Sequence, residues 1–134
     1  MNAIETTILL IDDDLIANFY NQKVILKTQP TAKVISFEGT KMALNYLNKL
    51  NDDGKHPSPD IILLDINMPE MDGWSFLEAY TKTKFSKNSA TKIFILTSEN
   101  FEENKEKKAR YKIVSNYICK PLDKNKLKKL LTAL

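Results

Sequence analysis

The sequence predicts an α/β fold in which a parallel β-sheet carries helices on both faces. Strand-like and helix-like segments alternate along the chain in five pairs, which is the pattern of a parallel sheet with crossover helices. Residues 61–64 are four consecutive aliphatic side chains bounded by turn-forming residues, which fits a central strand buried on both faces. With 134 residues the chain can bury a core without disulfides or a structural metal, so we expect one domain over residues 1–134.

Composition and charge narrow the classes of function. The chain is 43% apolar and 28% charged, as is typical of a soluble globular protein. Its formal net charge of +3 is too mild to indicate a nucleic-acid binder. Basic residues gather in segments 105–110 and 124–129, but helices usually carry such charges on their solvent face. We therefore expect no direct contact with nucleic acid.

The sequence carries no sign of a membrane or secretory segment. No apolar run approaches the length of a membrane span, and the first residues lack the pattern of a signal peptide. The single cysteine, Cys119, excludes an internal disulfide and fits a reducing compartment. These observations predict a cytoplasmic protein that does not contact a membrane.

The N-terminal half supplies two predicted strand–helix pairs. We expect strands over residues 7–11 and 33–37, and helices over about 15–27 and 40–50. Asp14 is placed to cap the first helix. Apolar residues recur at helical spacing in the first helix, the pattern of a core-facing stripe: Ile16, Phe19, Tyr20 and Val24. The second helix is expected to bury Met42, Ala43, Tyr46, Leu47 and Leu50.

The C-terminal half continues the alternation after a loop over residues 51–59. His56 in that loop has no neighbour at a ligand spacing, so we interpret it as a solvated loop residue. Helices are predicted from Trp74, over about 101–113, and at the C-terminus, and the helix over 101–113 should pack most loosely. Strands are predicted over 92–96 and 116–119. The last helix should direct Leu127, Leu130, Leu131 and Leu134 inward.

The residues that end these strands carry the candidate chemistry. A parallel sheet brings its strand ends to one edge, so it would gather three carboxylates, a hydroxyl and an ammonium there: Asp12, Asp13, Asp65, Thr97 and Lys120. Close carboxylates repel one another, and a hard divalent cation relieves that repulsion. We therefore predict a Mg²⁺ site, completed by a backbone carbonyl from the turn after Asp65. Taken alone, Asp65 is equally well explained as a residue that caps a turn.

This arrangement fits phosphoryl transfer to an aspartate. A cation beside Asp65 would keep its carboxylate ionised and polarise an incoming phosphoryl group. Lys120 and Thr97 would supply a positive charge and a hydrogen bond to the phosphoryl oxygens. Asp65 would then be the nucleophile and form an acyl phosphate.

The same residues carry a family resemblance. Through segments 9–14, 63–73, 95–98 and 117–121, the chain resembles the receiver domain of two-component response regulators, the CheY-like fold. The resemblance implies a doubly wound, flavodoxin-like, five-stranded parallel sheet of order 2-1-3-4-5. It also implies a cis peptide bond between Lys120 and Pro121, against the statistical preference for trans.

The resemblance assigns a role to each site residue. Asp65 matches the phosphoacceptor, and Asp12 and Asp13 match the acidic pair that holds Mg²⁺. Asn67 matches the residue that lends the metal its backbone carbonyl. Thr97 and Lys120 match the residues that contact the phosphoryl group, and Tyr117 matches the aromatic residue that acts as a switch.

The resemblance also implies the partners. A sensor histidine kinase or a histidine phosphotransfer protein would donate the phosphoryl group, and the phosphorylated chain would bind an unknown downstream protein. The chain would phosphorylate and dephosphorylate itself and would not be a turnover enzyme. Two segments depart from the common pattern, the long loop 51–59 and residues 112–116, and they leave the partner surface open. Homodimerisation on phosphorylation also stays open.

Three other interpretations compete with this one. The same topology binds flavin or nucleotides, but such proteins need a glycine-rich or hydroxyl-rich phosphate loop, whereas residues 12–14 are three aspartates. A haloacid-type phosphatase also uses an aspartate nucleophile, but places it after the first strand. An inactive pseudo-receiver would serve only for protein contact, and the complete acidic and lysine set argues against it.

Overall fold

The chain folds into one five-stranded sheet between two helical layers. The computed structural model describes residues 6–53, 59–66, 72–83, 90–97 and 111–132, and among these the side chains of residues 50–53 are not described. The strands are β1 (Thr7–Ile11), β2 (Lys33–Phe37), β3 (Ile61–Asp65), β4 (Lys92–Thr97) and β5 (Val114–Cys119). The helices are α1 (Leu15–Thr28), α2 (Thr40–Asp53), α3 (Gly73–Thr81) and α6 (Lys124–Thr132).

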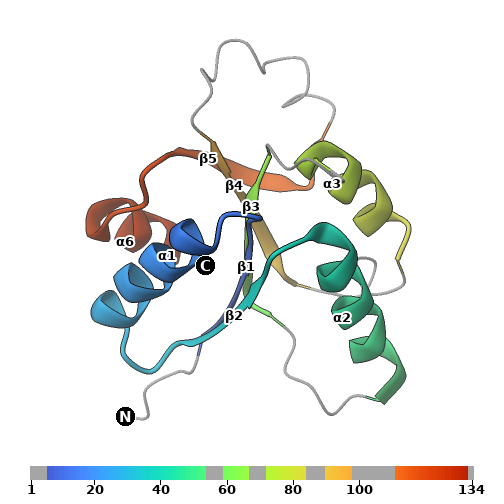
Figure 1. Cartoon of the computed structure of the whole chain (residues 1–134), viewed down its shortest axis with the longest axis horizontal. Coiled ribbons are helices and arrows are strands. Elements are labelled where there is room, and N and C mark those ends of the chain that lie inside the picture. The colour runs from blue at the N-terminus through green and yellow to red at the C-terminus, as the bar shows by residue number, and fades with distance from the viewer. Residues whose placement is uncertain (1–5, 54–58, 67–71, 84–89, 98–110, 133–134) are drawn as a thin grey trace.

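The sheet is parallel, with the order β2-β1-β3-β4-β5, so the predicted fold class and strand order are confirmed. Figure 1 shows α1 and α6 on one face of the sheet and α2 and α3 on the other. The predicted cis peptide bond between Lys120 and Pro121 is also present. Among the described residues, no helix is both long enough and apolar enough to span a bilayer.

Alternate side chains of the central strands face the two helical layers, as expected for strands buried on both faces. Toward α2 and α3, one cluster includes Leu9, Ile11, Leu64, Leu47 and Phe76. Toward α1 and α6, the other includes Ile8, Leu10, Leu63, Ile25 and Leu127. All five residues of β1 and of β3 are buried, which fixes the ends of these two strands firmly relative to each other.

The predicted apolar stripe of α1 does not face the core, and this part of the sequence interpretation is wrong. Ile16 is 80% exposed, Phe19 61% and Tyr20 46%, and only Val24 of the predicted set is partly buried against the core. The buried residues of α1 are Asn18, Asn21 and Ile25. The phase of the helix follows from its start, because Asp14 caps it and Asn18 bonds inward to the carbonyl of Asp12 at 2.9 Å.

Smaller differences concern the limits of elements and one buried position. Met42 is 60% exposed, whereas Ala43 and Leu47 are buried as predicted. Helix α2 continues to Asp53 instead of ending near Leu50, whose side chain lies outside the described residues. Tyr46 is partly buried and packs against the core of the α2 side. Leu134 and His56 also lie outside the described part of the chain.

The last three residues of the helix predicted over residues 101–113 are not helical. Residues 98–110 lie outside the described part of the chain, but residues 111–113 form a turn and not a helix. Tyr111 stacks on Trp74 with ring centroids 5.2 Å apart, and its carbonyl accepts a hydrogen bond from the Val114 N–H at 3.1 Å. This packing sets the start of β5 at Val114 instead of Asn116.

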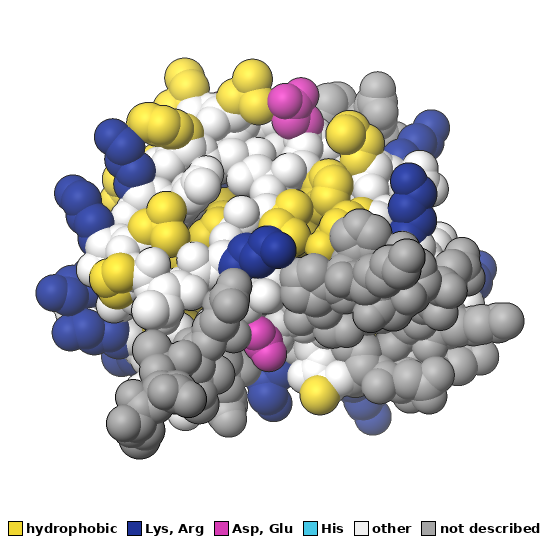
Figure 2. Space-filling view, turned by 90° about the horizontal axis from the view of Figure 1, so that it is seen from below, with side chains coloured by type: hydrophobic (Ala, Val, Ile, Leu, Met, Phe, Trp, Pro, Cys, Tyr) yellow, Lys and Arg dark blue, Asp and Glu magenta, His cyan; other side chains and the backbone are white. Residues whose placement is uncertain are grey.

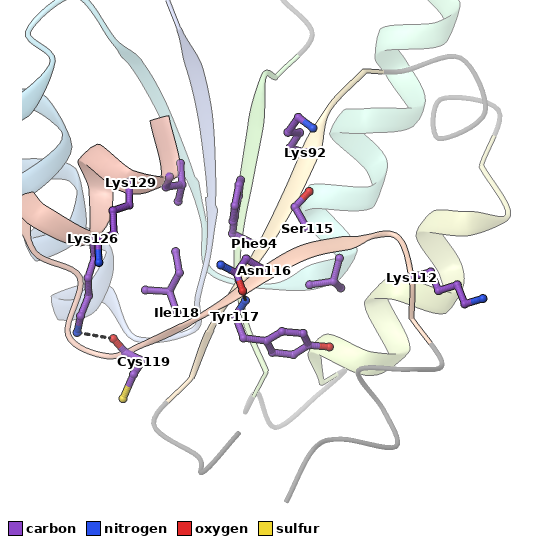
Figure 3. Close-up of a pocket in the computed structure, with 12 residues that line it drawn as sticks. Lys92, Phe94, Lys112, Ser115, Asn116, Tyr117, Ile118, Cys119, Lys126 and Lys129 are labelled. Carbon is purple, nitrogen blue, oxygen red and sulfur yellow. Dashed lines mark hydrogen bonds between the residues drawn. The ribbon is translucent and has the colours of Figure 1, made fainter. Parts of the chain in front are cut away.

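Both edge strands of the sheet limit further strand pairing. On β5, the Asn116 carboxamide oxygen accepts from the Tyr117 N–H at 2.8 Å, and Lys126 Nζ donates to the Cys119 carbonyl at 2.8 Å (Figure 3). On β2, Lys33 is exposed and Ile35 is half-buried. Charged and self-bonded edges of this kind discourage edge-to-edge association.

Figure 2, viewed from below Figure 1, shows hydrophobic side chains in separate groups interrupted by Lys or Arg side chains.

The orientation of α1 predicts effects of very different size for two isoleucine substitutions. Ile25→Ala should lower the free energy of unfolding by about 2–5 kcal/mol, because Ile25 is fully buried. Ile16→Ala should change it by about 0.5 kcal/mol or less, because that side chain is 80% exposed. Urea unfolding followed by circular dichroism measures both values. Equal losses for the two variants would contradict the outward orientation of Ile16.

Candidate functional site

Three carboxylates meet at the C-terminal edge of the sheet, as the sequence predicted. Asp12 follows β1, Asp13 is next to it, and Asp65 ends the neighbouring strand β3. One oxygen of each carboxylate lies within 4.8 Å of the others. Asp12 and Asp65 are each only 4% exposed, whereas Asp13 is exposed to solvent. Two buried carboxylates therefore share a small space with a third that faces the solvent.

Lys120 brings a positive charge to the same place. Its Nζ donates to Asp65 Oδ1 at 3.0 Å and lies 3.6 Å from Asp12 Oδ2. The Lys120 N–H donates to the carbonyl of Thr97 at 2.9 Å, which aligns the end of β5 with the end of β4. The lysine is therefore positioned by the sheet itself and bridges two of the three acids.

The turn after β1 is fixed by its own aspartates. The Asp14 N–H donates to Asp12 Oδ1 at 2.9 Å, and Asp14 Oδ1 in turn accepts from the N–H groups of Ile16 and Ala17 at 2.9 and 3.3 Å. Asp14 therefore serves as the N-cap of α1, as predicted, and leaves Asp12 and Asp13 to face the site.

Gly73 allows α3 to begin directly against the end of β3. Its N–H donates to the carbonyl of Ile66 at 2.8 Å. A Cβ at this position would lie 2.8 Å from the carbonyl oxygen of Asp65 and 2.8 Å from the Cα of Ile66. A side chain there would push the backbone of Asp65 away, so glycine is required for this close approach.

Thr97 and Tyr117 occupy the positions expected from the sequence. Thr97 ends β4 and is fully buried, and Tyr117 is 7% exposed on β5. Figure 3 shows the Tyr117 ring on the opposite side of β5 from Ile118. There it packs against Trp74, with ring centroids 6.3 Å apart. Burial raises the pKa of Tyr117 above its usual value.

The sequence interpretation missed two residues beside Tyr117, the predicted switch residue. Trp74 lies between Tyr117 and Tyr111 in a row of aromatic rings. The Tyr111 hydroxyl donates to Glu78 Oε1 at 2.9 Å, which ties the start of β5 to α3. Nothing in the sequence places Tyr111 near α3, because 33 residues separate it from Glu78. An aromatic residue directly after the Asp-Gly pair was the only available sign for Trp74.

Burial and the neighbouring negative charges disfavour the ionised form of Asp12. Burial, together with the charges of Asp65 and Asp13, raises the pKa of Asp12 from 3.8 to about 6, against the opposing effects of the Asp14 N–H and Lys120. Burial by itself lowers the pKa of Lys120, but its hydrogen bond to Asp65 and the charges of Asp65 and Asp12 outweigh this, so its pKa is raised. An additional cation at the site would therefore stabilise the ionised carboxylate of Asp12.

The donor set fits a hard divalent cation. Asp12 Oδ2 is buried and accepts no hydrogen bond from the described residues. With the oxygens of Asp13 and Asp65 it offers the carboxylate ligands that Mg²⁺ accepts, and solvent reaches the site past the exposed Asp13. Asn67, predicted to supply a carbonyl ligand, lies outside the described residues. Asp12, Asp13 and Asp65 are therefore the residues that would hold the ion.

The raised pKa of Asp12 predicts that the metal-free protein becomes more stable on mild acidification. The folded state binds this proton with a pKa of about 6, whereas the ordinary value is 3.8. Between these two values the folded state holds more protons, so the free energy of unfolding should rise by about 1 kcal/mol from pH 7 to pH 5.

Thermal or urea unfolding with a chelator present measures this pH dependence. Asp12→Asn should remove the gain, since the asparagine does not titrate. Saturating Mg²⁺ should reverse it, because the ion binds only the ionised carboxylate. The same rise toward pH 5 in Asp12→Asn would contradict the assignment to Asp12.

Comparisons with known proteins agree with the fold. The family model described as the response regulator receiver domain matches residues 8–132. The chain is 29% identical over 130 residues to the chemotaxis protein CheY of Treponema pallidum (strain Nichols), covering 94% of this chain and 80% of that protein.

Solved structures give the same result. A two-component response regulator from Cytophaga hutchinsonii superposes with a TM-score of 0.85 at 30% identity, covering 98% of this chain and 97% of the other. One from Legionella pneumophila gives a TM-score of 0.78 at 26% identity, with 96% and 97% covered. The chain therefore belongs to the receiver domain family of two-component response regulators and has the CheY-like fold.

Proposed function

We propose that Asp65 accepts a phosphoryl group in a Mg²⁺-dependent reaction. The observation that carries this proposal is the position of Asp65: it is buried, lies 3.0 Å from Lys120 Nζ, and shares its site with two other carboxylates. An oxygen of Asp65 forms a bond to phosphorus while the bond between phosphorus and the donor breaks, and the donor keeps the bonding electrons. The product is an acyl phosphate on Asp65.

The other site residues have supporting roles. Bound Mg²⁺ would neutralise charge on the acids and on the phosphoryl oxygens. Lys120, now bonded to Asp65, can move its hydrogen bond to a phosphoryl oxygen, since its side chain is 32% exposed and lies at the mouth of the site. Thr97 ends the adjacent strand, where its hydroxyl would bond a second phosphoryl oxygen. The acids keep Lys120 protonated for this purpose.

The phosphoryl donor would be a sensor histidine kinase or a histidine phosphotransfer protein. Such a donor must dock beside Asp65, and α1 begins next to the acidic site with an apolar outer surface. The α1 stripe, as we call it, consists of Leu15, Ile16, Phe19 and Tyr20. Lys23 Nζ lies 4.6 Å above the Phe19 ring and adds a positive rim. Exposed apolar groups on one side of a helix suit an amphipathic helix of a partner protein.

The downstream protein would bind near β5. The phosphoryl group would pull Thr97 toward it, and Tyr117 would respond through the shared core, which shifts the population of two surface states. A pocket of about 670 Å³ lies along β5 and α6, and lysines line it, among them Lys92, Lys112, Lys126 and Lys129 (Figure 3). This charge favours a target with acidic side chains.

The chain is proposed as a phosphoacceptor that loses its phosphoryl group by hydrolysis, and not as a turnover enzyme. A small phosphatase or a flavin-binding or nucleotide-binding module is the alternative. The turn after β1 presents carboxylates where such a module needs phosphate-binding N–H groups, since the Asp14 N–H is bonded to Asp12. A phosphoacceptor gains one phosphoryl group per chain, whereas a phosphatase releases phosphate continuously.

Labelling with a small phosphodonor tests the assignment. With Mg²⁺ and acetyl phosphate, the chain should gain one phosphoryl group by mass spectrometry, and peptide mapping after borohydride reduction should place it on Asp65. Asp65→Asn should gain none, and Asp13→Ala should lose most labelling because metal binding weakens. Emission of the single tryptophan, Trp74, should change with labelling, since it packs against Tyr117. Undiminished labelling of Asp65→Asn, or continuous hydrolysis of phosphate esters, would overturn the proposal.

The α1 stripe predicts a second, separable effect. Phe19→Asp should slow phosphorylation by a phosphohistidine protein at least tenfold, because a charge in an apolar contact costs more than about 1.4 kcal/mol. Labelling by acetyl phosphate should not change, since Phe19 lies outside the acidic cluster. Met42→Asp is the matched control, because Met42 on α2 is 60% exposed and Phe19 61%. Equal slowing in both variants would contradict docking on α1.

A further inference from the structure

Asn18 is a buried polar residue in a place where an apolar one would be expected. It lies on the inward face of α1 and is only 5% exposed. A buried carboxamide is costly unless it forms hydrogen bonds. Its Nδ2 donates to the carbonyl of Asp12 at 2.9 Å and lies 3.5 Å from the carbonyl of Phe37. Its Oδ1 is buried and accepts no hydrogen bond from the described residues. The carboxamide therefore serves mainly as a donor.

These bonds join three elements at the acidic site. The carbonyl of Phe37 at the end of β2 also accepts from the Asp12 N–H at 3.1 Å. One side chain on α1 thus links the end of β1 to the end of β2. The N–H side of Asp12 is held by β2, and its carbonyl side is held by Asn18.

The carbonyl that Asn18 holds belongs to the peptide unit between Asp12 and Asp13. That unit is planar, so its orientation sets the directions in which the two residues leave it. Asp12 Oδ1 is already bonded to the Asp14 N–H, which leaves Oδ2 for the site. Rotation of this peptide would move the Asp12 and Asp13 carboxylates relative to Asp65, whose position β3 fixes independently.

We propose that Asn18 is a positioning residue for the metal site: by holding the peptide between Asp12 and Asp13, it keeps both carboxylates in the arrangement that binds a divalent cation. This inference rests on the proposed function, which requires that cation. Residues that orient metal ligands without touching the ion typically contribute about 10- to 100-fold to affinity. Without the carboxamide, the Phe37 carbonyl keeps its bond from the Asp12 N–H, whereas the Asp12 carbonyl loses its bond from Asn18.

Asn18→Leu separates positioning from a structural role. Leucine has the same number and branching of side-chain heavy atoms but lacks the donor. Removal of the unsatisfied buried Oδ1 offsets the loss of the bond to the Asp12 carbonyl, so the variant should unfold at a urea concentration close to that of the unaltered protein. Its affinity for Mn²⁺, used as the probe ion for the Mg²⁺ site, should fall by about 10- to 100-fold. The matched control is Asn21→Leu, since Asn21 is buried on the same face of α1 one turn further from the site.

Mn²⁺ binding to the full chain is measured by the electron paramagnetic resonance signal of the free ion, and folding by circular dichroism. We expect weaker Mn²⁺ binding for Asn18→Leu and a dissociation constant within twofold of the unaltered value for Asn21→Leu. Asn18→Ala provides the same comparison where leucine does not fit. A dissociation constant for the Asn18 variants within twofold of the unaltered value would overturn the positioning role alone. Absence of Mn²⁺ binding to the unaltered chain would overturn the proposed function together with this inference.

Discussion

The mutual repulsion of three carboxylates is the constraint on which the site depends. Asp12, Asp13 and Asp65 are held within 4.8 Å of one another, and burial raises the pKa of Asp12 to about 6. Lys120 offsets part of this repulsion from the opposite side, at 3.0 Å from Asp65. In water the four groups would separate or exchange partners, so the surrounding fold must hold them in place. A site with unsatisfied negative charge is prepared for a cation and for a group whose charge the cation shares.

The parallel sheet supplies the necessary rigidity. β1 and β3 are buried along their whole length and pair in register, so Asp12 and Asp65 cannot move apart without breaking both core clusters. The Thr97 carbonyl holds Lys120 through its N–H, and Gly73 lets α3 pack directly on the end of β3. Strain at the site is therefore offset by the hydrophobic burial beneath it. Functional sites commonly contain unfavourable charge interactions that the stability of the surrounding fold offsets.

The two faces of helix α1 have an unusual distribution of polar and apolar side chains. Polar side chains, Asn18 and Asn21, face the sheet, whereas Ile16 and Phe19 face solvent. An ordinary amphipathic helix would have the reverse arrangement. The inward asparagine serves the turn that carries the acids, and the outward apolar groups are available to a partner. Both departures from the usual pattern lie beside the acidic cluster, where function is expected to override the local rules of folding.

The sequence by itself determined the alternation of strands and helices, the fold class and the polar residues that end the strands, because buried aliphatic runs and the side chains that end them are local features, whereas the strand order came from the family resemblance. It also indicated the cap at Asp14 and, through family resemblance, the cis bond before Pro121, and all of these are present. Only the tertiary structure decided which face of α1 is buried, that Met42 is exposed, and where β5 begins. These features depend on contacts between distant segments, such as Asn18 with Phe37 and Tyr111 with Trp74. Hydrophobic periodicity gives the spacing of an apolar stripe, but only hydrogen bonds and packing across the fold decide the direction in which that stripe points.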